Sequence, residues 1–209
     1  MAVAVLKQQF ESVLWQARPE PELLASGIPG IDLPRGCLTE IAGPSSSGRT
    51  TLLHSILAAS TSAGETCAVV DADDAFDPAT AAAVGVRLEN VLWVRCGKDA
   101  EAALKAADLL IQGGGFGVVA LDLGDTPPAT ARRISLTSWF RLRRAVENTP
   151  TVFIALARKL NARTCVSMTI ECARERAIWS GNLFRGIRVR AKTTQRRKAC
   201  SPVFTAKAI

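Results

Sequence analysis

The stretch LTEIAGPSSSGRTTLLHSI, from Leu38 to Ile56, decides the fold of this 209-residue chain. It reads as an apolar strand, a Gly/Ser-rich loop and a helix whose apolar residues recur at helical spacing. The loop fits the pattern G-x-x-x-x-G-K/R-T, in which two glycines let backbone N–H groups surround a phosphate at a helix N-terminus. The sequence therefore predicts a nucleotide-binding loop. The alternative is a serine-rich turn that fits the pattern by chance.

Two residues at the end of the loop set its expected chemistry. The common lysine, a compact point charge on the β- and γ-phosphates, is replaced by Arg49, a longer and planar fork. We expect binding to tolerate this change better than hydrolysis. Thr50 supplies the hydroxyl expected to hold Mg²⁺. The predicted nucleotide-binding residues are Gly43, Pro44, Ser45, Ser46, Ser47, Gly48, Arg49, Thr50 and Thr51.

Composition limits the class of protein. The chain is 48% apolar and long enough for one well-buried α/β domain with appendages, whereas a second full domain is not expected. No apolar run approaches the roughly 20 residues of a membrane span, and the first residues do not read as a secretory signal. We therefore expect a cytoplasmic protein with no membrane partner. The six cysteines form no C-x-x-C pair, so no zinc or redox motif is present.

The net charge of +7 hides a strong asymmetry along the chain. Residues 1–131 carry 8 Lys/Arg and 16 Asp/Glu, whereas residues 132–209 carry 18 Lys/Arg and 3 Asp/Glu. A cationic block of this kind favours a polyanion, because neutralised phosphates release their counterions on binding. Nucleic acid or an acidic protein partner is therefore expected at the C-terminal third, and the alternative is a solvated charged face.

Strands and helices alternate beyond the loop. Apolar strands that alternate with helices are typical of a parallel sheet with helices on both faces, so the predicted fold class is α/β. Later β-like runs are expected to add antiparallel strands at one edge. The expected strands span 66–71, 90–95, 117–122 and 151–155, the helices 77–85, 99–111 and 129–148, and the later runs 166–171, 184–192 and 202–207.

The first residues differ from this pattern. Residues 3–17 place apolar side chains on one side at helical spacing, which predicts an amphipathic helix. Four prolines in residues 18–36 predict an extended connector. We expect residues 1–24 to be a leader helix and linker, and residues 25–209 to form the nucleotide-binding domain with its basic C-terminal third.

Carboxylates follow two of the expected strands. Ligands of open α/β sheets lie beyond the C-terminal strand ends, so Asp122 is expected to join Thr50 in holding magnesium. Asp71, Asp73 and Asp74 follow another strand, where one of them would orient an attacking water. The alternative for both positions is that these acids only cap turns.

Two long runs carry a family resemblance. IPGIDLPRGCLTEIAGPSSSGRTTL and AVVDADDAFDPATAAAVGVRLENVLWVRC resemble the ATP-binding core of the RecA family, and the resemblance extends over about residues 25–209. It implies a RecA-like P-loop NTPase fold, ATP and Mg²⁺ as ligands, and single-stranded DNA as a partner. Asp122 falls at the family's second carboxylate. Asp73 stands at the position of its water-orienting glutamate, which makes it the catalytic candidate.

Departures from the family pattern imply nucleotide binding with slow or no turnover. Arg49 replaces the loop lysine, Asp73 is one methylene shorter than glutamate, and Leu156 stands where a polar glutamine senses the γ-phosphate. The connections at 124–131 and 158–164 are short for the family's two DNA-binding loops, although basic residues lie directly after the first and within the second. The DNA-binding residues that the resemblance implies are Arg132, Arg133, Arg158, Lys159 and Arg163.

Within this family, a short and basic chain is most similar to ImuA, a group of RecA-like accessory proteins. That resemblance implies a role in translesion synthesis and the SOS response beside repair or polymerase partner proteins. The alternatives are an active DNA-dependent ATPase or recombinase, and a nucleotide-free scaffold.

Four further residues are open to two interpretations each. Arg196 and Lys198 match two lysines that reach a neighbouring subunit's nucleotide, which implies a homo-oligomer, or they belong to the general cationic tail. Trp139 and Trp179 lie among basic residues, where they either stack on bases or belong to the core.

Overall fold

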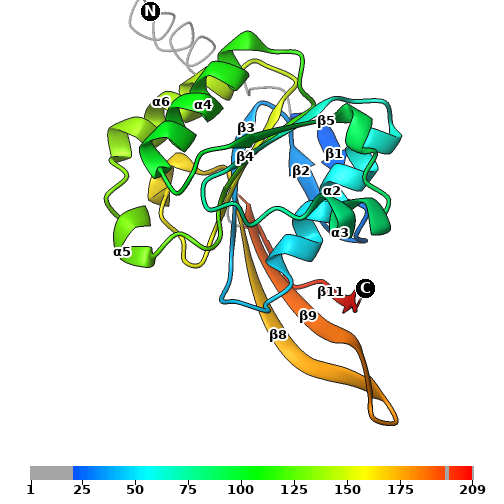
Figure 1. Ribbon diagram of the computed structural model, residues 1–209. Coiled ribbons are helices and arrows are strands. Elements are labelled where there is room, and N and C mark those ends of the chain that lie inside the picture. The colour runs from blue at the N-terminus through cyan, green and yellow to red at the C-terminus, as the bar shows by residue number, and fades with distance from the viewer. Residues whose placement is uncertain (1–20, 196–197, 209) are drawn as a thin grey trace, which may run out of the picture.

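The computed structural model describes residues 21–195 and 198–208 (Figure 1). Its centre is a nine-stranded sheet in the order β10-β9-β8-β3-β7-β6-β4-β5, with β11 also paired to β9. The strands from β8 to β5 in this order pair in parallel, and the pairs that β9 makes are antiparallel. The predicted α/β fold with antiparallel strands at one edge is confirmed. The strands are β3 (Cys37–Ala42), β4 (Cys67–Asp71), β5 (Val91–Arg95), β6 (Val118–Leu123), β7 (Val152–Ala157), β8 (Met168–Ser180), β9 (Leu183–Gln195), β10 (Lys198–Cys200) and β11 (Val203–Lys207).

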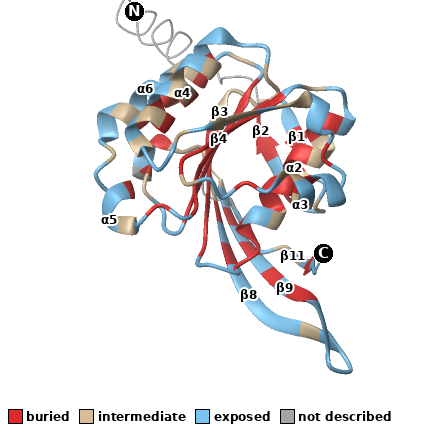
Figure 2. Ribbon diagram, in the orientation of Figure 1, coloured by how far each residue is buried: buried red, intermediate tan, exposed pale blue. Residues whose placement is uncertain are grey.

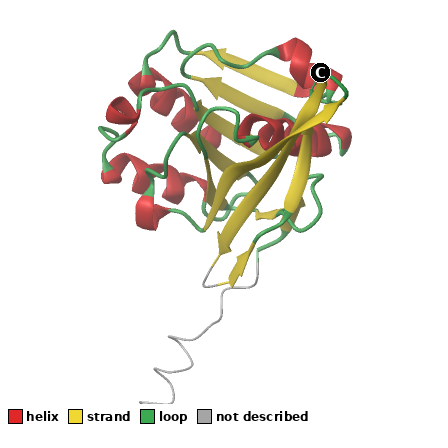
Figure 3. Ribbon diagram, turned by 90° about the horizontal axis from the view of Figure 1, so that it is seen from below, coloured by secondary structure: helices red, strands yellow, loops and turns green. Residues whose placement is uncertain are grey.

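Helices cover both faces of the sheet, as the view from below also shows (Figure 3). α2 (Arg49–Ser62) and α3 (Pro78–Ala83) pack into one apolar cluster, whereas α4 (Ala100–Gly113) and α6 (Leu136–Val146) pack into the other. The helix expected at 129–148 is divided into α5 (Pro128–Ala131) and α6, because Ser135 starts a new helix by accepting from the Ser138 N–H. The described residues also contain two short 3₁₀ helices, η1 (Leu88–Asn90) and η2 (Arg163–Cys165). None of the helices in the described part of the chain is long and apolar enough to cross a membrane.

The middle of the sheet is buried on both faces (Figure 2). Every residue of β4, β6 and β7 is buried, which explains why these strands read as continuous apolar runs rather than alternating ones. Trp139 of α6 is 1% exposed and belongs to the core, so the core interpretation of this tryptophan is correct.

A small two-stranded sheet precedes β3. β1 (Leu23–Ala25) and β2 (Asp32–Pro34) pair in antiparallel within the stretch whose prolines predicted an extended connector. The connector is therefore ordered, because Leu24, Ile31 and Leu33 bury their side chains in the same cluster as α2. The amphipathic helix expected at residues 3–17 lies outside the described residues.

The hairpin of β8 and β9 is the longest feature of the fold and extends beyond the body of the molecule (Figure 1). Its base pairs with β3, and its outer part, residues 173–190, is called the β8–β9 arm below. The sequence predicted separate β-like runs here. They are parts of 13-residue strands, whose outer β8 residues are mostly exposed and so lack an apolar alternation.

Candidate nucleotide-binding site

The glycine-rich loop connects β3 to α2 at the C-terminal end of the parallel strands. Ser46 and Gly48 both have positive φ angles, of 58° and 87°, and the Ser47 N–H donates to the Pro44 carbonyl at 3.2 Å. Gly48 is the N-cap residue of α2 and has no side chain, so no side-chain hydrogen bond caps this helix. The backbone N–H groups in the first turn of α2 therefore lack the usual side-chain acceptor and are suited to binding an anion.

Both loop glycines are required by close packing against the hairpin. A Cβ on Gly43 would meet the Ser47 hydroxyl and would stand 2.6 Å from the carbonyl oxygen of Cys172 in β8. A Cβ on Gly48 would stand 2.5 Å from Cγ2 of Val189 in β9. The base of the hairpin therefore packs against the loop. The sequence does not indicate this contact, because Cys172 and Val189 follow the loop by more than 120 residues.

Arg49 is turned into the protein and holds two loops together. Its Nη1 donates to the Gly43 carbonyl at 2.5 Å, and its Nη2 donates to the Gly124 carbonyl at 2.6 Å. Nη2 also lies 3.4 Å from a carboxylate oxygen of Asp125. The side chain is only 7% exposed. Burial lowers the pKa of Arg49, and the nearby carboxylates of Asp122 and Asp125 oppose that shift. Asp125 and Gly124 are partners that the sequence did not indicate.

Asp122 lies on β6 beside the loop and is 5% exposed. Its Oδ1 accepts a hydrogen bond of 2.7 Å from the Gly124 N–H, and no described residue donates to its Oδ2. Burial raises the pKa of this carboxyl to about 6, although the Gly124 N–H and Arg49 favour the charged form. The described residues contain no cluster of three or more His, Cys, Asp or Glu side chains that would hold a metal alone. A magnesium ion here would thus depend on Asp122, Thr50 and ligand or water oxygens, which are the oxygen donors that Mg²⁺ prefers.

The three acids after β4 have different roles. Asp71 is fully buried and accepts from the backbone N–H groups of Asp73, Ala75 and Phe76 and from Trp93 Nε1, so it orders the turn. Asp74 lies 2.9 Å from Arg95 Nε on the surface.

Asp73 alone is directed at the loop after β6. It accepts a hydrogen bond from the hydroxyl of Thr126, a buried residue that sequence reasoning also missed. The strand register sets Asp122 beside both Asp71 and Leu156. The structure therefore places Asp73 and Asp122 at the C-terminal ends of neighbouring strands, with an apolar, 1% exposed Leu156 beside Asp122.

The basic residues predicted to bind DNA or a neighbouring subunit have different surroundings. Arg158 donates from Nε to the Gly124 carbonyl at 3.1 Å and lies 3.5 Å from Asp125, so it shares both partners with Arg49. Arg132, Arg133 and Lys159 are exposed. Arg163 belongs to η2, Lys198 begins β10, and Arg196 lies outside the described residues. Among the candidates whose side chains the structure describes, Arg132, Arg133 and Lys159 are therefore exposed cations without a described ion pair.

A buried glutamate explains the short connection after β7. Glu40 in β3 is 1% exposed and accepts from the N–H groups of Asn161 at 2.5 Å and Ala162 at 3.2 Å. Burial raises the pKa of Glu40 while these two hydrogen bonds oppose the shift. Ala162 and Cys165 are fully buried beside it. This connection is therefore folded against the sheet instead of forming a long loop.

The chain is similar to proteins of the RecA family. The family model of the RecA N-terminal domain matches residues 22–128, about half of the chain. Protein RecA of Deinococcus radiodurans is 46% identical over 99 residues, which are 47% of this chain and 26% of that protein. Protein RecA of Rhodospirillum centenum is 42% identical over 115 residues (51% and 32%). Protein RecA of Chloroflexus aurantiacus is 34% identical over 145 residues (63% and 40%). The chain thus spans about a quarter to two fifths of the length of these relatives.

Proposed function

This chain belongs to the RecA family, and from that premise we propose that it binds ATP and Mg²⁺ with slow or no hydrolysis and acts in DNA repair, recombination or translesion mutagenesis. The observation that carries the proposal is the position of Arg49. Its guanidinium, which occupies the place of the loop lysine, is held by the Gly43 and Gly124 carbonyls. The backbone N–H groups of the loop are therefore available to an anion, whereas the Arg49 guanidinium is already hydrogen-bonded to the protein.

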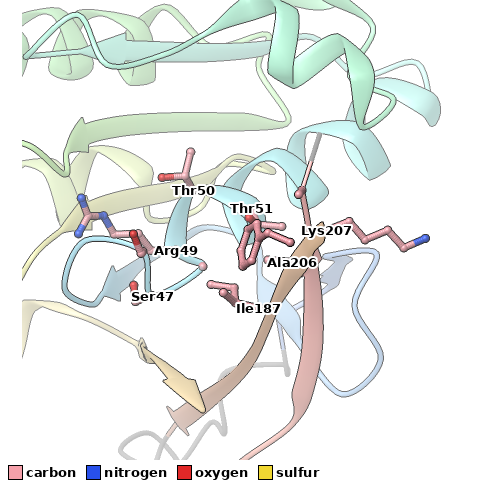
Figure 4. A pocket seen from close by; sticks show the side chains of 11 residues that line it. Ser47, Arg49, Thr50, Thr51, Ile187, Ala206 and Lys207 are labelled. Atoms are coloured by element: carbon pink, nitrogen blue, oxygen red, sulfur yellow. The ribbon is translucent and has the colours of Figure 1, made fainter. Parts of the chain in front are cut away.

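Support for nucleotide binding comes from the shape of the loop surroundings (Figure 4). A pocket of about 280 Å³ adjoins the loop and joins it to β9 and β11. Arg49 extends away from Ile187 and Ala206, so its side chain leaves this pocket open. The residues that line the pocket are Ser46, Ser47, Gly48, Arg49, Thr50, Thr51, Phe184, Ile187, Ala206, Lys207 and Ala208. If the phosphates bind at the N-terminus of α2, this pocket is available to the rest of the nucleotide.

Three features support slow turnover. Arg49 would have to break two buried hydrogen bonds to reach a γ-phosphate, and hydrogen bonds to charged groups contribute about 1.5–3 kcal/mol each. Leu156 has no group that could donate to that phosphate. Asp73 is held by Thr126, so a water-orienting role would require it to share its carboxylate. Each feature weakens stabilisation of the transition state more than it weakens binding.

The charge of the C-terminal third supports DNA or a repair or polymerase protein as the partner. A homo-oligomer and the role of an ImuA-like accessory protein remain parts of the same proposal. The experiment is isothermal titration of the full chain with ATP and Mg²⁺, with phosphate release followed in parallel. Wild type is compared with Arg49→Lys and Arg49→Ala.

We expect saturable ATP binding by the wild type without measurable phosphate release. Arg49→Lys should bind ATP at least as tightly, because a flexible ammonium is free to approach the phosphates. It should also unfold more easily by about 1–3 kcal/mol, because one ammonium cannot reproduce both hydrogen bonds of the fork. Arg49→Ala, which has neither cation nor tether, should bind ATP at least tenfold more weakly than Arg49→Lys.

Two outcomes would replace the proposal by its alternatives. Phosphate release that single-stranded DNA stimulates, and that Asp73→Ala abolishes, would make the protein a DNA-dependent ATPase. The absence of saturable ATP binding by both wild type and Arg49→Lys would make it a nucleotide-free scaffold.

A further inference from the structure

The tip of the β8–β9 arm exposes three large apolar side chains. Trp179 is 59% exposed, Leu183 56% and Phe184 41%. Trp179 and Phe184 are paired across the two strands, with ring centroids 5.3 Å apart and planes at 67°. Because the rings meet edge to face, the contact leaves ring surface open. Figures 1 and 2 show this tip at the far end of the arm, away from the covered faces of the sheet.

Trp179 and Phe184 contact each other, but both side chains keep much of their surface in solvent. The arm is held by its cross-strand hydrogen bonds and by Glu175, which lies 3.3 Å from Arg188 Nε and 2.7 Å from Arg190 Nε. In contrast, Trp139 is buried in the core and Trp93 donates to Asp71. Trp179 is the tryptophan of the described residues whose ring is left to solvent. An aromatic pair that is left largely in solvent is suited to a partner.

The charge of the arm identifies the kind of partner. Residues 173–190 contain five arginines and one glutamate, and that glutamate is already paired with Arg188 and Arg190. Arg174, Arg176 and Arg185 are exposed and have no ion pair among the described residues. The arm therefore presents cations beside aromatic rings. Single-stranded nucleic acid has the complementary composition, with phosphates and unpaired flat bases on one chain.

We propose that the tip of the β8–β9 arm binds single-stranded nucleic acid, with a base stacked on Trp179 and phosphates near Arg174, Arg176 and Arg185. The inference rests on the DNA-binding part of the proposed function and assigns it a site separate from the connections after β6 and β7. An acidic protein surface would also match the charge, but it does not require an open ring surface. A protein partner is therefore the competing outcome of the test.

Phe184 needs separate treatment in the design of variants, because it also lines the pocket beside Ser46 to Thr51. A change at Phe184 would alter the nucleotide pocket and the arm together. Trp179 and Leu183 are not among the residues of that pocket. Trp179→Ala is therefore the variant that tests stacking, and Trp179→Phe restores a ring. Leu109→Ala, at a 70% exposed leucine on α4, is the matched control for removing an exposed apolar side chain.

The experiment measures fluorescence anisotropy of a labelled oligo(dT) titrated with the full chain. Trp179→Ala should weaken oligo(dT) binding about 10- to 100-fold. Trp179→Phe should weaken it much less, and Leu109→Ala should leave the affinity unchanged. Tryptophan emission of the wild type should fall on oligo(dT) addition, and Trp179→Phe should abolish that change. Arg176→Gln should reduce the salt dependence by about one phosphate contact. Inorganic polyphosphate has no bases, so Trp179→Ala should leave its affinity unchanged.

The possible failures differ from one another. Equal oligo(dT) affinity of wild type and Trp179→Ala would overturn this inference and leave DNA binding elsewhere intact. No binding of oligo(dT) by the wild type at low salt would overturn both this inference and the DNA-binding part of the proposed function. If Trp179→Ala instead abolishes self-association in sedimentation while oligo(dT) affinity is unchanged, the tip is a protein interface and the inference is wrong.

Discussion

A Gly43→Ala variant is expected to lose saturable ATP binding and to be less stable than the wild type by about 3 kcal/mol, the upper end of typical overpacking. The added Cβ would stand 2.6 Å from the Cys172 carbonyl oxygen and would also meet the Ser47 side chain. A hydroxyl is able to rotate away, but Cys172 belongs to a strand that is paired with β3 on one side and β9 on the other. The loop must therefore move, and its N–H groups lose their common direction.

Thermal unfolding and ATP titration of Gly43→Ala test this expectation. At about 2–4 °C per kcal/mol for a chain of this size, the midpoint should fall by roughly 6–12 °C. Gly113→Ala is the matched control, because no atom lies within 4 Å of its added Cβ and it ends α4. That change should be neutral or slightly stabilising. Normal ATP affinity of Gly43→Ala would show that the backbone of the loop does not bind the phosphates.

The fold was predictable because its main signals are local. The apolar runs at β4, β6 and β7 are buried on both faces, so their composition alone indicates parallel strands between helices. The three-residue strands β1 and β2 carry no such signal, because proline and turn residues surround them. The arm was recognised only in part, since ion pairs such as Glu175 with Arg190 join residues that are 15 positions apart.

The candidate site could be predicted only as far as its motif extends. The nucleotide-binding role of residues 43–51 is a prediction from their spacing, and the roles of Asp73 and Asp122 are predictions from their positions after strands. The partners that determine their chemistry are distant in the sequence. Arg49 is bound to Gly124, 75 residues later, and Asp73 accepts from Thr126, 53 residues later. A motif shows that a cation is present at position 49, but only the tertiary structure shows which oxygens hold it.

Asp122→Asn is expected to stabilise the protein above pH 6 and to weaken Mg²⁺-dependent nucleotide binding. The folded protein raises the pKa of Asp122 from 3.8 to about 6 by burial, so folding favours the neutral carboxyl. Stability from this group is fully present below pH 3.8 and is lost as the pH rises through about 6. At 1.36 kcal/mol per pKa unit, the ionised form costs up to about 3 kcal/mol. Asparagine avoids this cost and keeps an oxygen for the Gly124 N–H.

Unfolding midpoints of Asp122→Asn and wild type should therefore coincide near pH 3.5 and diverge up to pH 6, above which the variant stays higher. ATP affinity of the wild type with Mg²⁺ should increase through the same pH range, because only the ionised carboxylate attracts the metal. The variant should lose this pH dependence. Its ATP affinity should be at least tenfold weaker than that of the wild type when Mg²⁺ is present, but nearly the same when Mg²⁺ is absent. A midpoint of Asp122→Asn below the wild type at pH 8 would contradict the expectation, since Arg49 would then stabilise the carboxylate more than burial destabilises it.

Asp71→Asn is the control with the opposite expected sign. Asp71 lies beside Asp122 in the strand register and is equally buried, but it accepts hydrogen bonds from three backbone N–H groups and from Trp93. An amide would direct its own N–H₂ at these donors and leave part of them unpaired, which costs about 1–3 kcal/mol for each buried group. Two neighbouring carboxylates should thus respond oppositely to the same substitution. The difference arises because Asp71 accepts four hydrogen bonds that order the turn, whereas Asp122 accepts one, from the Gly124 N–H, and no described residue donates to its Oδ2. Under the proposed function, that free oxygen is the one that would bind Mg²⁺.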